Sequence, residues 1–364
     1  MGGSHISAAG LIAAMDKSRF DPTIVLLGEP GMLTEFFQSV SVPVKRIDIG
    51  SRNLANPVSA WKAVSRAARH LADGRYDVVH TNEGKMHAVW GIAAKMAGVK
   101  QVWHHRGNPA ARGLTLLAPA VAERVVSVSS YAAPRPSFYS AAERCTVIHS
   151  PFDLSLCDTD RAASRKAAIA SLGVPEDAVL IGYFGHYSDR KRPVGFIDAL
   201  AAARRRMPER EIHGLMFGEE HDEGMLARMQ SAIERHGLGK NVRLMGFRKP
   251  IAPWIAACDA TLVTAVQEPF GRTLIEAMLL ETPVIAAASG GNLEAIEDGV
   301  TGLLAPADDP DALADALVRL LSRPDLAESI ATHARLDALD KFGIEAHTRA
   351  VEAVYDSLSS GASV

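Results

Sequence analysis

The sequence has few cysteines and no long apolar run. Three cysteines occur in 364 residues, Cys145, Cys157 and Cys258, and none of them forms a CxxC pair. An odd number without metal-ligand spacing argues against a disulfide framework and against a zinc site, so a reducing cytosol is the expected setting. No apolar stretch approaches the roughly 20 residues that span a bilayer, and the first residues lack the basic-then-apolar order of a secretory signal. Any membrane contact is therefore expected to be peripheral.

The sequence also lacks an excess of charge of one sign. It contains 39 Lys and Arg against 42 Asp and Glu, which gives a formal net charge of −3. This balance does not indicate a nucleic-acid partner. The composition, 48% hydrophobic and 22% charged, is typical of a soluble globular protein. A chain of 364 residues is long enough for two domains of ordinary size.

Short apolar runs alternate along the chain with longer, Ala-rich amphipathic segments. The runs that predict strands are 23–27, 78–81, 101–104, 125–128, 180–184, 212–217, 242–245, 260–266 and 284–288. The segments that predict helices include 59–71, 88–97, 194–206, 224–236 and 310–321. Strands that alternate with helices predict an α/β protein with parallel sheets.

A segment rich in proline, charge and alanine, residues 150–175, separates the two halves. We therefore expect an N-terminal domain at 1–155 and a C-terminal domain at 156–343. A last helix within 344–364 could pack on either domain, including back on the first. Residues 1–7 predict a glycine loop before a helix at 8–15, although a parallel α/β domain normally begins with a strand. Either the start lies late or has been cut, or the domain folds without its first strand.

Two carboxylates eight residues apart bracket a predicted turn after the run 260–266. The stretch Glu268-Pro-Phe-Gly-Arg-Thr-Leu-Ile-Glu276 places Glu268 before a predicted helix and Glu276 inside it. Unpaired N–H groups at such a helix start suit a phosphate, and the carboxylates can bind sugar hydroxyls. The alternative is a solvated helix start, where the helix dipole favours glutamate. Gly271 and Arg272 favour a ligand site, because glycine allows close backbone approach and arginine adds a cation.

Three cations, Arg190-Lys191-Arg192, follow the predicted strand 180–184 and the loop 185–189. In open α/β sheets ligands bind at the carboxyl ends of strands, so these cations are placed to bind a diphosphate. The alternative is a solvated basic helix start. Cations at a helix N-terminus oppose the dipole, and an anionic ligand would reverse that cost.

Three weaker signals accompany these motifs. Residues 289–292, Ser-Gly-Gly-Asn, form a second glycine-rich turn between a strand and a helix. Phe247 and Arg248 follow the run 242–245 and could offer a ring and a cation to a base. Gly3, in the first glycine loop, could let the backbone approach a phosphate. Plain turns and packing are the alternatives for all three.

The run Trp103-His104-His105-Arg106 ends a predicted strand with two imidazoles and a guanidinium. Histidines at a strand end can act as acid/base groups or bind sugars. Metal binding is not expected, because alternate strand residues point to opposite faces and no carboxylate lies nearby. His80, which ends the run Asp77-Val-Val-His, is expected to be structural.

Taken in order, these motifs resemble those of family-4 retaining glycosyltransferases with the GT-B fold, over nearly the whole chain. The donor-domain series is Gly185…Lys191, Gly246-Phe247, Glu268-x7-Glu276, Gly290-Gly291 and Asp298-Gly-Val-Thr-Gly-Leu-Leu304. The acceptor-domain landmarks are Gly2-Gly3 and residues 77–80, 103–106 and 147–153. The resemblance implies two Rossmann-like parallel α/β domains that face a central cleft, with the first N-terminal strand missing here.

The resemblance also implies residue roles. Lys191 would hold the donor diphosphate, Glu276 would bind the ribose hydroxyls and Glu268 would bind the transferred sugar. We add Arg190, where the family often has an acidic residue, as a second cation for the leaving diphosphate. His105, or His104, would orient donor or acceptor. The other residues implied are Gly3, Gly185, His186, Phe247, Arg248, Phe270, Gly271, Arg272 and Thr273 on the donor, with His104 and Arg106 on the acceptor side. One departure is His186, where the family usually has arginine; Arg190 is the candidate replacement.

The implied function is a retaining, metal-independent hexosyltransferase without a cofactor. It would use a UDP-, GDP- or ADP-sugar and a saccharide or lipid-linked acceptor in cell-surface polysaccharide or lipopolysaccharide assembly. It would be cytoplasmic, with peripheral contact at the inner membrane face and no nucleic-acid partner. Two alternatives stay open: a sugar-nucleotide epimerase-like enzyme on the same fold, and a catalytically weak donor-binding protein. The presence of His186 and the missing first strand are the reasons for considering a catalytically weak donor-binding protein.

Overall fold

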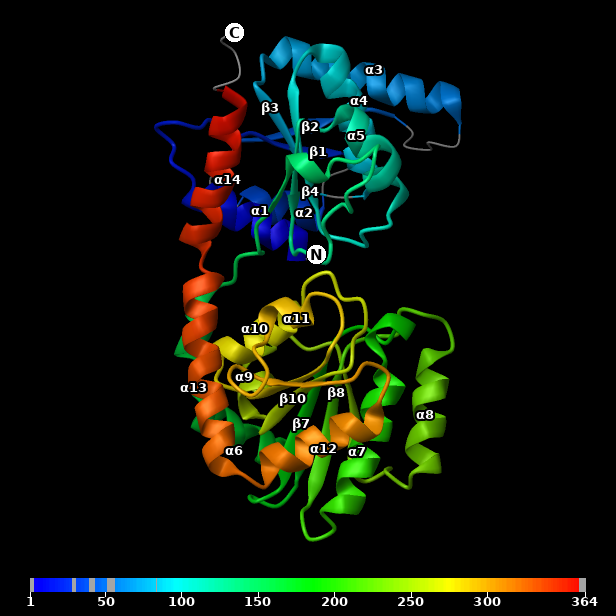
Figure 1. Ribbon diagram of the computed structural model, residues 1–364, viewed down its shortest axis with the longest axis vertical. Coiled ribbons are helices and arrows are strands. Elements are labelled where there is room, and N and C mark those ends of the chain that lie inside the picture. Colours follow the sequence, from blue (N-terminus) through cyan, green and yellow to red (C-terminus); the bar gives the residue numbers. More distant parts are fainter. Residues whose placement is uncertain (1–2, 28–30, 39–42, 51–55, 83, 360–364) are drawn as a thin grey trace. The chain divides into compact units, whose positions relative to one another are not determined.

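The computed structural model describes residues 3–27, 31–38, 43–50, 56–82 and 84–359. The chain divides into two compact units (Figure 1). Unit 1 comprises Met1–Pro151 together with Phe342–Val364, and unit 2 comprises Phe152–Lys341. The last helix, α14 (Ile344–Ser359), therefore belongs to the same unit as the first part of the chain.

Unit 1 is built on parallel strands. A four-stranded sheet has the order β3-β4-β5-β6, and a two-stranded sheet pairs β1 with β2. The strands are β1 (Ile24–Leu27), β2 (Val44–Ile47), β3 (Val78–Thr81), β4 (Lys100–His105), β5 (Arg124–Ser127) and β6 (Cys145–Val147). The helices before α14 are α1 (Gly3–Ala14), α2 (Met32–Gln38), α3 (Pro57–Gly74), α4 (Gly84–Ala97) and α5 (Ala118–Val121), with the short turns η1 (Gly113–Leu117) and η2 (Ala142–Arg144).

Helices cover both faces of the four-stranded sheet. Neighbouring strand residues point to opposite faces, so Val78 packs with α1 and α14 whereas Val79 packs with α3 and α4. Figure 1 shows α14 on one side of these strands and α3 and α4 on the other. Helix α3 begins at a regular cap, in which the Asn56 side chain accepts a hydrogen bond from Ser59 N at 3.1 Å.

Helix α1 begins earlier than the sequence predicts. A glycine loop is expected through Ser7, whereas Gly3 is the first residue of α1. The Ser7 hydroxyl donates to the Gly3 carbonyl, four residues back, at 2.9 Å, so it bonds within a helical turn. The loop prediction is wrong for residues 3–7, and Gly2 lies outside the described residues.

Unit 2 contains a six-stranded parallel sheet with the order β12-β11-β10-β7-β8-β9. Its strands are β7 (Val179–Phe184), β8 (Ile212–Phe217), β9 (Val242–Gly246), β10 (Ala260–Val263), β11 (Val284–Ala287) and β12 (Leu303–Ala305). Its helices are α6 (Arg161–Leu172), α7 (Pro193–Arg206), α8 (Met225–Arg235), α9 (Ala252–Ala257), α10 (Arg272–Leu279), α11 (Asn292–Ala295), α12 (Pro310–Leu321) and α13 (Pro324–Lys341), with the short turns η3 (Leu154–Asp158) and η4 (Asp189–Lys191).

The central strands of unit 2 are buried on both faces, as expected for a parallel sheet between helix layers. Helices α7, α8 and α12 share one apolar cluster with Ile181 and Met216. Gly214 allows α7 to approach β8, because a Cβ there would lie 2.7 Å from Leu200 Cδ2. On the other face the Phe217 ring lies 5.3 Å from Trp254 of α9.

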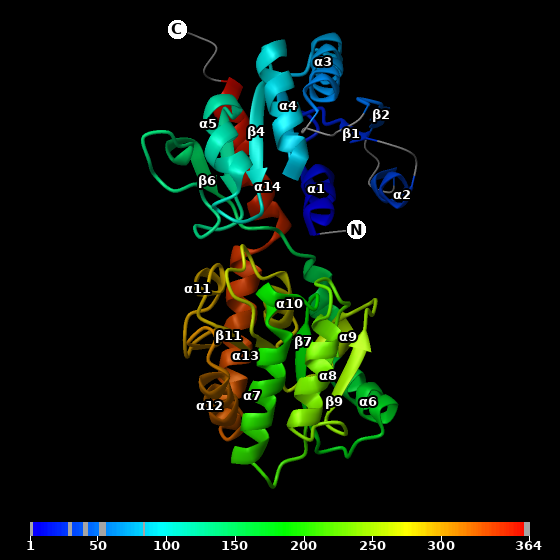
Figure 2. The ribbon, with the colours of Figure 1, turned by 90° about the vertical axis from the view of Figure 1, so that its right-hand side faces the viewer.

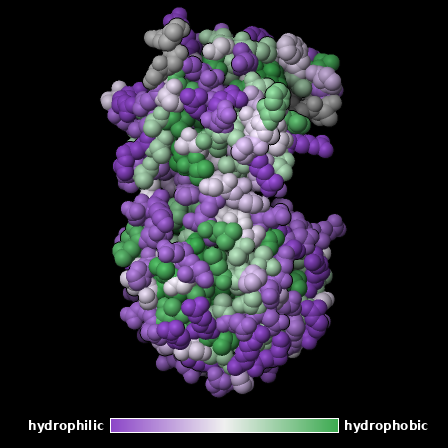
Figure 3. Space-filling model, viewed as in Figure 1, coloured by the Kyte–Doolittle hydropathy of each residue, from purple (hydrophilic) through white to green (hydrophobic). Residues whose placement is uncertain are grey.

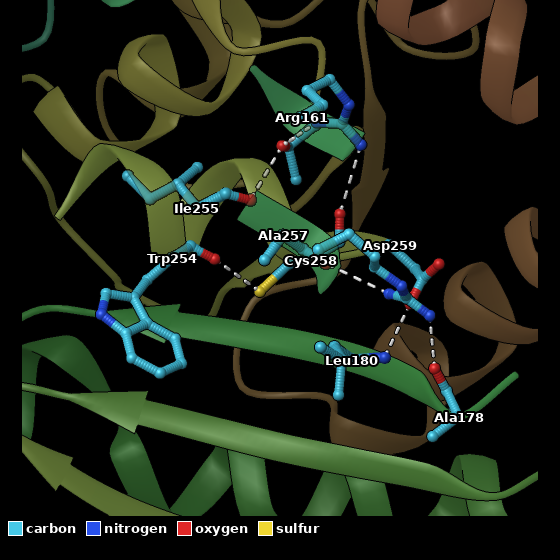
Figure 4. A network of polar contacts seen from close by, with 10 residues as sticks. Arg161, Ala178, Leu180, Trp254, Ile255, Ala257, Cys258 and Asp259 are labelled. Atoms are coloured by element: carbon cyan, nitrogen blue, oxygen red, sulfur yellow. Dashed lines mark hydrogen bonds and ion pairs between the residues drawn. The ribbon is translucent and has the colours of Figure 1, made fainter. Parts of the chain in front are cut away.

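A polar network ties α6 to the amino ends of β7 and β10 (Figure 4). Asp259 is its centre: its Oδ2 accepts from Leu180 N at 2.7 Å and from Arg165 Nη1 at 2.6 Å. Arg165 Nη1 also donates to the Ala257 carbonyl at 3.1 Å, and Arg161 Nη1 donates to the Leu280 carbonyl at 2.7 Å. Two arginines of α6 thus donate hydrogen bonds to carbonyl groups near the amino ends of β7 and β10.

Arg165→Ala should lower the free energy of unfolding of unit 2 by about 2 kcal/mol, because it removes the cation that pairs with the half-buried Asp259 carboxylate and the donor to the Ala257 carbonyl. Urea denaturation followed by tryptophan fluorescence measures the change. Arg319→Ala, an exposed position on α12, is the control and should stay within about 0.5 kcal/mol of wild type. Equal effects of the two substitutions would show that the network does not stabilise the unit.

Within the described ranges, none of the helices combines the length and the apolar content that crossing a bilayer requires. The face of the molecule shown in Figure 3 mixes hydrophilic and hydrophobic residues and carries no continuous apolar band.

Candidate functional site

The predicted cations and Glu268 follow two neighbouring strands at the centre of the unit 2 sheet. From β7 the chain proceeds through β8 to β9 on one side, and then returns to place β10 and β11 on the other side. The order reverses between β7 and β10, so the loops after these strands lead away in opposite directions. This switch point, at the carboxyl ends of the strands, is where open α/β sheets bind ligands.

The loop after β7 carries the cations on a short, sharply turned segment. Residues Asp189–Lys191 form η4, and Arg192 adopts φ 51° before α7 begins at Pro193. The Lys191 side chain passes beside Gly185, where a Cβ would lie 3.6 Å from Lys191 Cδ. Tyr183, at the end of β7, fixes the loop by donating from its hydroxyl to the His186 carbonyl at 2.9 Å.

The loop after β10 is bonded to the loop after β7. Thr264 Oγ1 donates to the Lys191 carbonyl at 2.8 Å and to the Arg192 carbonyl at 3.0 Å. Val266 N donates to the Arg190 carbonyl at 2.9 Å. These bonds end β10 at Val263, so the prediction of a strand through residue 266 is wrong: the next residues bond to a loop instead of continuing the ladder.

Glu268 forms ion pairs with both predicted cations. Its Oε2 lies 2.9 Å from Lys191 Nζ, and the same oxygen accepts from Arg190 Nη1. Glu268 is 7% exposed, so this carboxylate is largely removed from water. One buried carboxylate therefore pairs with two cations and leaves a net positive charge at the switch point, so an anionic ligand that took its place would meet two cations already in position.

The Ser289-Gly290-Gly291 turn supports the backbone of Glu268. Gly291 N donates to the Glu268 carbonyl at 2.7 Å, and Ser289 Oγ accepts from Gln267 N at 2.9 Å. A Cβ on Gly290 would lie 2.5 Å from the Glu268 carbonyl oxygen, and one on Gly291 would lie 2.6 Å from the Pro269 oxygen. Only glycine allows the backbone to approach this closely. The Ser289-Gly290-Gly291 turn, which was only a weak signal in the sequence, therefore positions the Glu268 carboxylate.

Glu276 lies in α10 beside Arg272. Burial raises its pKa, and Arg272, whose Nη2 is 3.5 Å from Glu276 Oε1, acts in the opposite direction. The Arg272 guanidinium also lies 4.5 Å from the centre of the Phe152 ring. Helix α10 starts at Arg272 without a side-chain cap, and Thr273 Oγ1 donates to the Phe184 carbonyl at 3.3 Å. This contact ties the first turn of α10 to the end of β7.

The remaining donor-side residues lie at the same edge of the sheet or on the surface. Phe270 is 7% exposed, and its ring lies 6.3 Å from that of Phe152. Phe247 is 64% exposed, and Arg248 is also exposed. Both follow β9, the edge strand, and β8 lies between β9 and β7 in the sheet. His186 is exposed, and its ring lies 5.7 Å from that of His221.

The predicted residues of unit 1 are mostly buried. His105 is 5% exposed, and its Nε2 bonds the Asn108 carbonyl at 3.0 Å. His104 is fully buried, with its Nδ1 3.0 Å from His80 Nε2 and its ring 6.1 Å from that of His347. Arg106 donates to Ser150 Oγ at 2.9 Å.

Burial lowers the pKa of His105 and, more strongly, that of His104, and Arg106 adds to the effect on His104. Both imidazoles are therefore neutral near pH 7. They can orient a ligand or a neighbouring group but cannot supply a fixed positive charge. The third predicted residue of this unit, Gly3, is the first residue of α1.

No metal-ligand group is formed by the side chains that the structure describes. Among them, no three His, Cys, Asp or Glu side chains lie together so that they could hold one ion. The three cysteines are free thiols.

Two family models match the chain. Residues 164–337 match glycosyl transferases group 1, and residues 2–149 match a glycosyl transferase 4-like domain. The D-inositol 3-phosphate glycosyltransferase of Streptomyces scabiei is 30% identical over 78% of this chain and 68% of its own length. The chain belongs to the group 1 glycosyltransferase family. The resemblance stated from the motifs is thereby confirmed.

Other relatives of this group 1 glycosyltransferase are matched over a smaller share of their length. The protein of the same name from a Nocardioides species is 31% identical over 75% of this chain and 66% of its own length. Three further relatives of the same name are covered over 42–48% of their lengths. The chain thus spans about half to two thirds of the length of these curated relatives.

Solved structures confirm the GT-B fold class. Anabaena HepE in complex with UDP and glucose is similar at a TM-score of 0.82, with 25% identity over 98% of this chain and 96% of that one. A glycosyltransferase from Rickettsia africae reaches a TM-score of 0.80 at 19% identity, which speaks for the fold alone. The two parallel-sheet α/β units described above are the two Rossmann-like halves of that fold.

Asn292 lies beside the candidate site, and the sequence analysis gave it no role. It is fully buried at the start of α11, and its Nδ2 donates to the Ala287 carbonyl at 3.0 Å. Its Oδ1 has no hydrogen-bond partner and lies 3.3 Å from where a Cβ of Gly271 would be. A buried side-chain oxygen therefore lies beside the start of α10. The sequence could not show that Asn292 and Gly271 are neighbours.

Proposed function

We propose that this protein is an enzyme that transfers a sugar from a nucleotide-diphosphate sugar to an acceptor hydroxyl. The observation that carries the proposal is the pairing of Lys191 and Arg190 with Glu268 at the switch point of the sheet. Two cations held together there suit a diphosphate, and a carboxylate beside them suits sugar hydroxyls. The related structures of HepE hold UDP and UDP-glucose, so UDP-glucose is the first donor to test.

In the proposed reaction the donor diphosphate takes the place of Glu268 between the cations. Lys191 and Arg190 then stabilise the negative charge that grows as the bond from the sugar carbon to the phosphate oxygen breaks. The first turn of α10, which has no side-chain cap, adds backbone N–H groups on the phosphate side. Glu268 is released toward the hydroxyls of the sugar, and Glu276 binds those of the ribose.

We further propose that the configuration at the sugar carbon is retained. The acceptor oxygen forms its bond on the face from which the diphosphate leaves, and a phosphate oxygen takes the acceptor proton. Neutral His105 orients a substrate in this scheme and is not the base. The scheme needs no protein carboxylate as a nucleophile, because the acceptor oxygen itself forms the new bond to the sugar carbon.

For the acceptor we propose a saccharide or a lipid-linked saccharide of cell-surface polysaccharide or lipopolysaccharide assembly. The names of the curated relatives make D-inositol 3-phosphate the second acceptor class to test. A cytoplasmic location fits the three free cysteines.

The test of the proposed function measures release of nucleotide diphosphate from UDP-, GDP- and ADP-sugars with and without acceptors. A transferase releases nucleotide only when an acceptor is present. An epimerase-like enzyme would convert the sugar nucleotide without an acceptor. Tight nucleotide binding without turnover across a broad acceptor panel would favour a donor-binding protein instead.

Gly291→Ala should lower turnover about tenfold or more, because a methyl group would push against the Pro269 carbonyl and displace Glu268. Steady-state kinetics with saturating donor measures this. Gly239→Ala is the matched control, since a Cβ there meets open space. The positioning role of the turn fails if Gly291→Ala keeps wild-type turnover in a normally folded protein.

Removal of divalent metal should leave turnover within about twofold of its original value, because two fixed cations supply the charge that a metal would otherwise provide. Activity is measured before and after treatment with EDTA. A loss of more than about tenfold that added Mg²⁺ or Mn²⁺ restores would overturn the metal-independent mechanism.

A further inference from the structure

Three exposed apolar side chains of unit 1 form a group that the proposed reaction does not use. We name Leu116, Phe138 and Tyr139 the aromatic patch. Phe138 is fully exposed, Leu116 is 65% exposed and Tyr139 is 52% exposed. The Tyr139 hydroxyl donates to the Leu116 carbonyl at 3.2 Å, which joins the loop between β5 and β6 to the turn η1. Figure 2 shows this loop projecting from unit 1 beside α5 and β6.

The loop that carries the aromatic patch is held in shape by its own hydrogen bonds. Ser140 Oγ donates to the Arg135 carbonyl at 2.7 Å, and Ser137 Oγ donates to the Tyr139 carbonyl at 3.1 Å. Pro134 and Pro136 restrict the backbone further. The exposed rings therefore lie on an ordered, projecting tip, and their exposure costs free energy that a partner surface could recover.

The surroundings of the aromatic patch are basic. Arg112 and Arg135, in the two segments that carry the patch, are exposed. The sequence from residue 106 to residue 144 contains five arginines and two acidic residues, Glu123 and Glu143.

We propose that the aromatic patch, with Arg112 and Arg135, docks on a bilayer surface that carries anionic head groups. Aromatic side chains are favoured at the depth of the head groups, and arginines nearby are attracted to lipid phosphates. A stable protein partner needs roughly 800 Å² on each side, which three side chains on a projecting tip do not provide. A lipid surface adapts to such a tip. The proposal does not depend on which sugar the enzyme transfers.

The test is sedimentation of the full chain with vesicles of phosphatidylcholine alone or with phosphatidylglycerol added. The wild type should bind the anionic vesicles at least tenfold more tightly, and Phe138→Ser with Tyr139→Ser should lose about tenfold or more of that binding. Arg112→Gln with Arg135→Gln should weaken binding to anionic vesicles by about fivefold per arginine at low salt. Trp61→Ser is the matched control, because Trp61 is a 61% exposed aromatic on α3 outside the patch.

Thermal unfolding and nucleotide binding of each variant should match the wild type, since the substituted side chains are exposed; equal values show that the chain is folded. The proposal is overturned if the wild type does not bind anionic vesicles, or if the Phe138/Tyr139 variant binds them as well as Trp61→Ser. It is also overturned if the patch substitutions change the molecular mass in light scattering while vesicle binding stays unchanged, which would identify a second copy as the occupant.

Discussion

Glu268→Gln should lower turnover about a hundredfold or more without weakening the binding of UDP. The amide keeps the shape of the side chain but cannot act as a negative partner to the sugar hydroxyls or to the charge that develops near the reacting carbon. In the proposed reaction Glu268 also competes with the donor diphosphate for Lys191 and Arg190, since its Oε2 pairs with both. Removing that competitor should raise UDP affinity by up to about tenfold.

Steady-state kinetics and calorimetric titration with UDP measure the two effects separately. Glu281→Gln is the control, because Glu281 pairs with Arg335 at 3.2 Å in the same unit and outside the Glu268 group. A Glu268→Gln enzyme with wild-type turnover would remove Glu268 from the mechanism. A large loss of UDP affinity would contradict its role as a competing anion.

Lys191→Met should lower kcat/KM about a thousandfold and UDP affinity about tenfold to a hundredfold. The methionine keeps the apolar stem that passes beside Gly185 but removes the charge that binds the diphosphate. The affinity for UMP should change less, because UMP lacks the second (β) phosphate of UDP, with which Lys191 is proposed to pair.

The control for this substitution is Lys240→Met, an exposed lysine between α8 and β9. Kinetics give kcat/KM, and competition binding gives the two nucleotide affinities. If Lys191→Met lowered UMP and UDP affinity equally, Lys191 would contact the nucleoside side of the donor instead of the leaving phosphate.

The sequence predicted the alternation of strands and helices because short apolar runs and longer amphipathic segments carry strong periodic signals. It missed β2, β6 and β12, which are short, and β2 has two cations in the sequence Val44-Lys-Arg-Ile47. It gave no sign of α13, whose buried stripe is Ile330, Ala334 and Ala338, since alanine is a weak apolar signal. Such elements depend on their neighbours more than on their own residues.

The candidate site could be located from the sequence but not assembled. Strand-end motifs indicated Lys191 and Glu268, because parallel strands place their carboxyl ends at one edge. The sharing of one Glu268 oxygen by two cations depends on the order of β7 and β10 in the sheet, which the sequence does not give. The support of Glu268 by Gly290 and Gly291 depends on contact between loops more than 20 residues apart. The sequence placed His104 and His105 at a strand end but did not give their exposure, and only their packing shows that they are buried.

The most direct test of the exchange between Glu268 and the donor diphosphate is calorimetric titration of UDP into three proteins. The predicted order of affinity is Glu268→Gln at or above wild type, and wild type well above Lys191→Met. The reverse order, with Glu268→Gln weaker than wild type and Lys191→Met unchanged, would contradict the account, because the diphosphate would then not occupy the place of Glu268 between the cations.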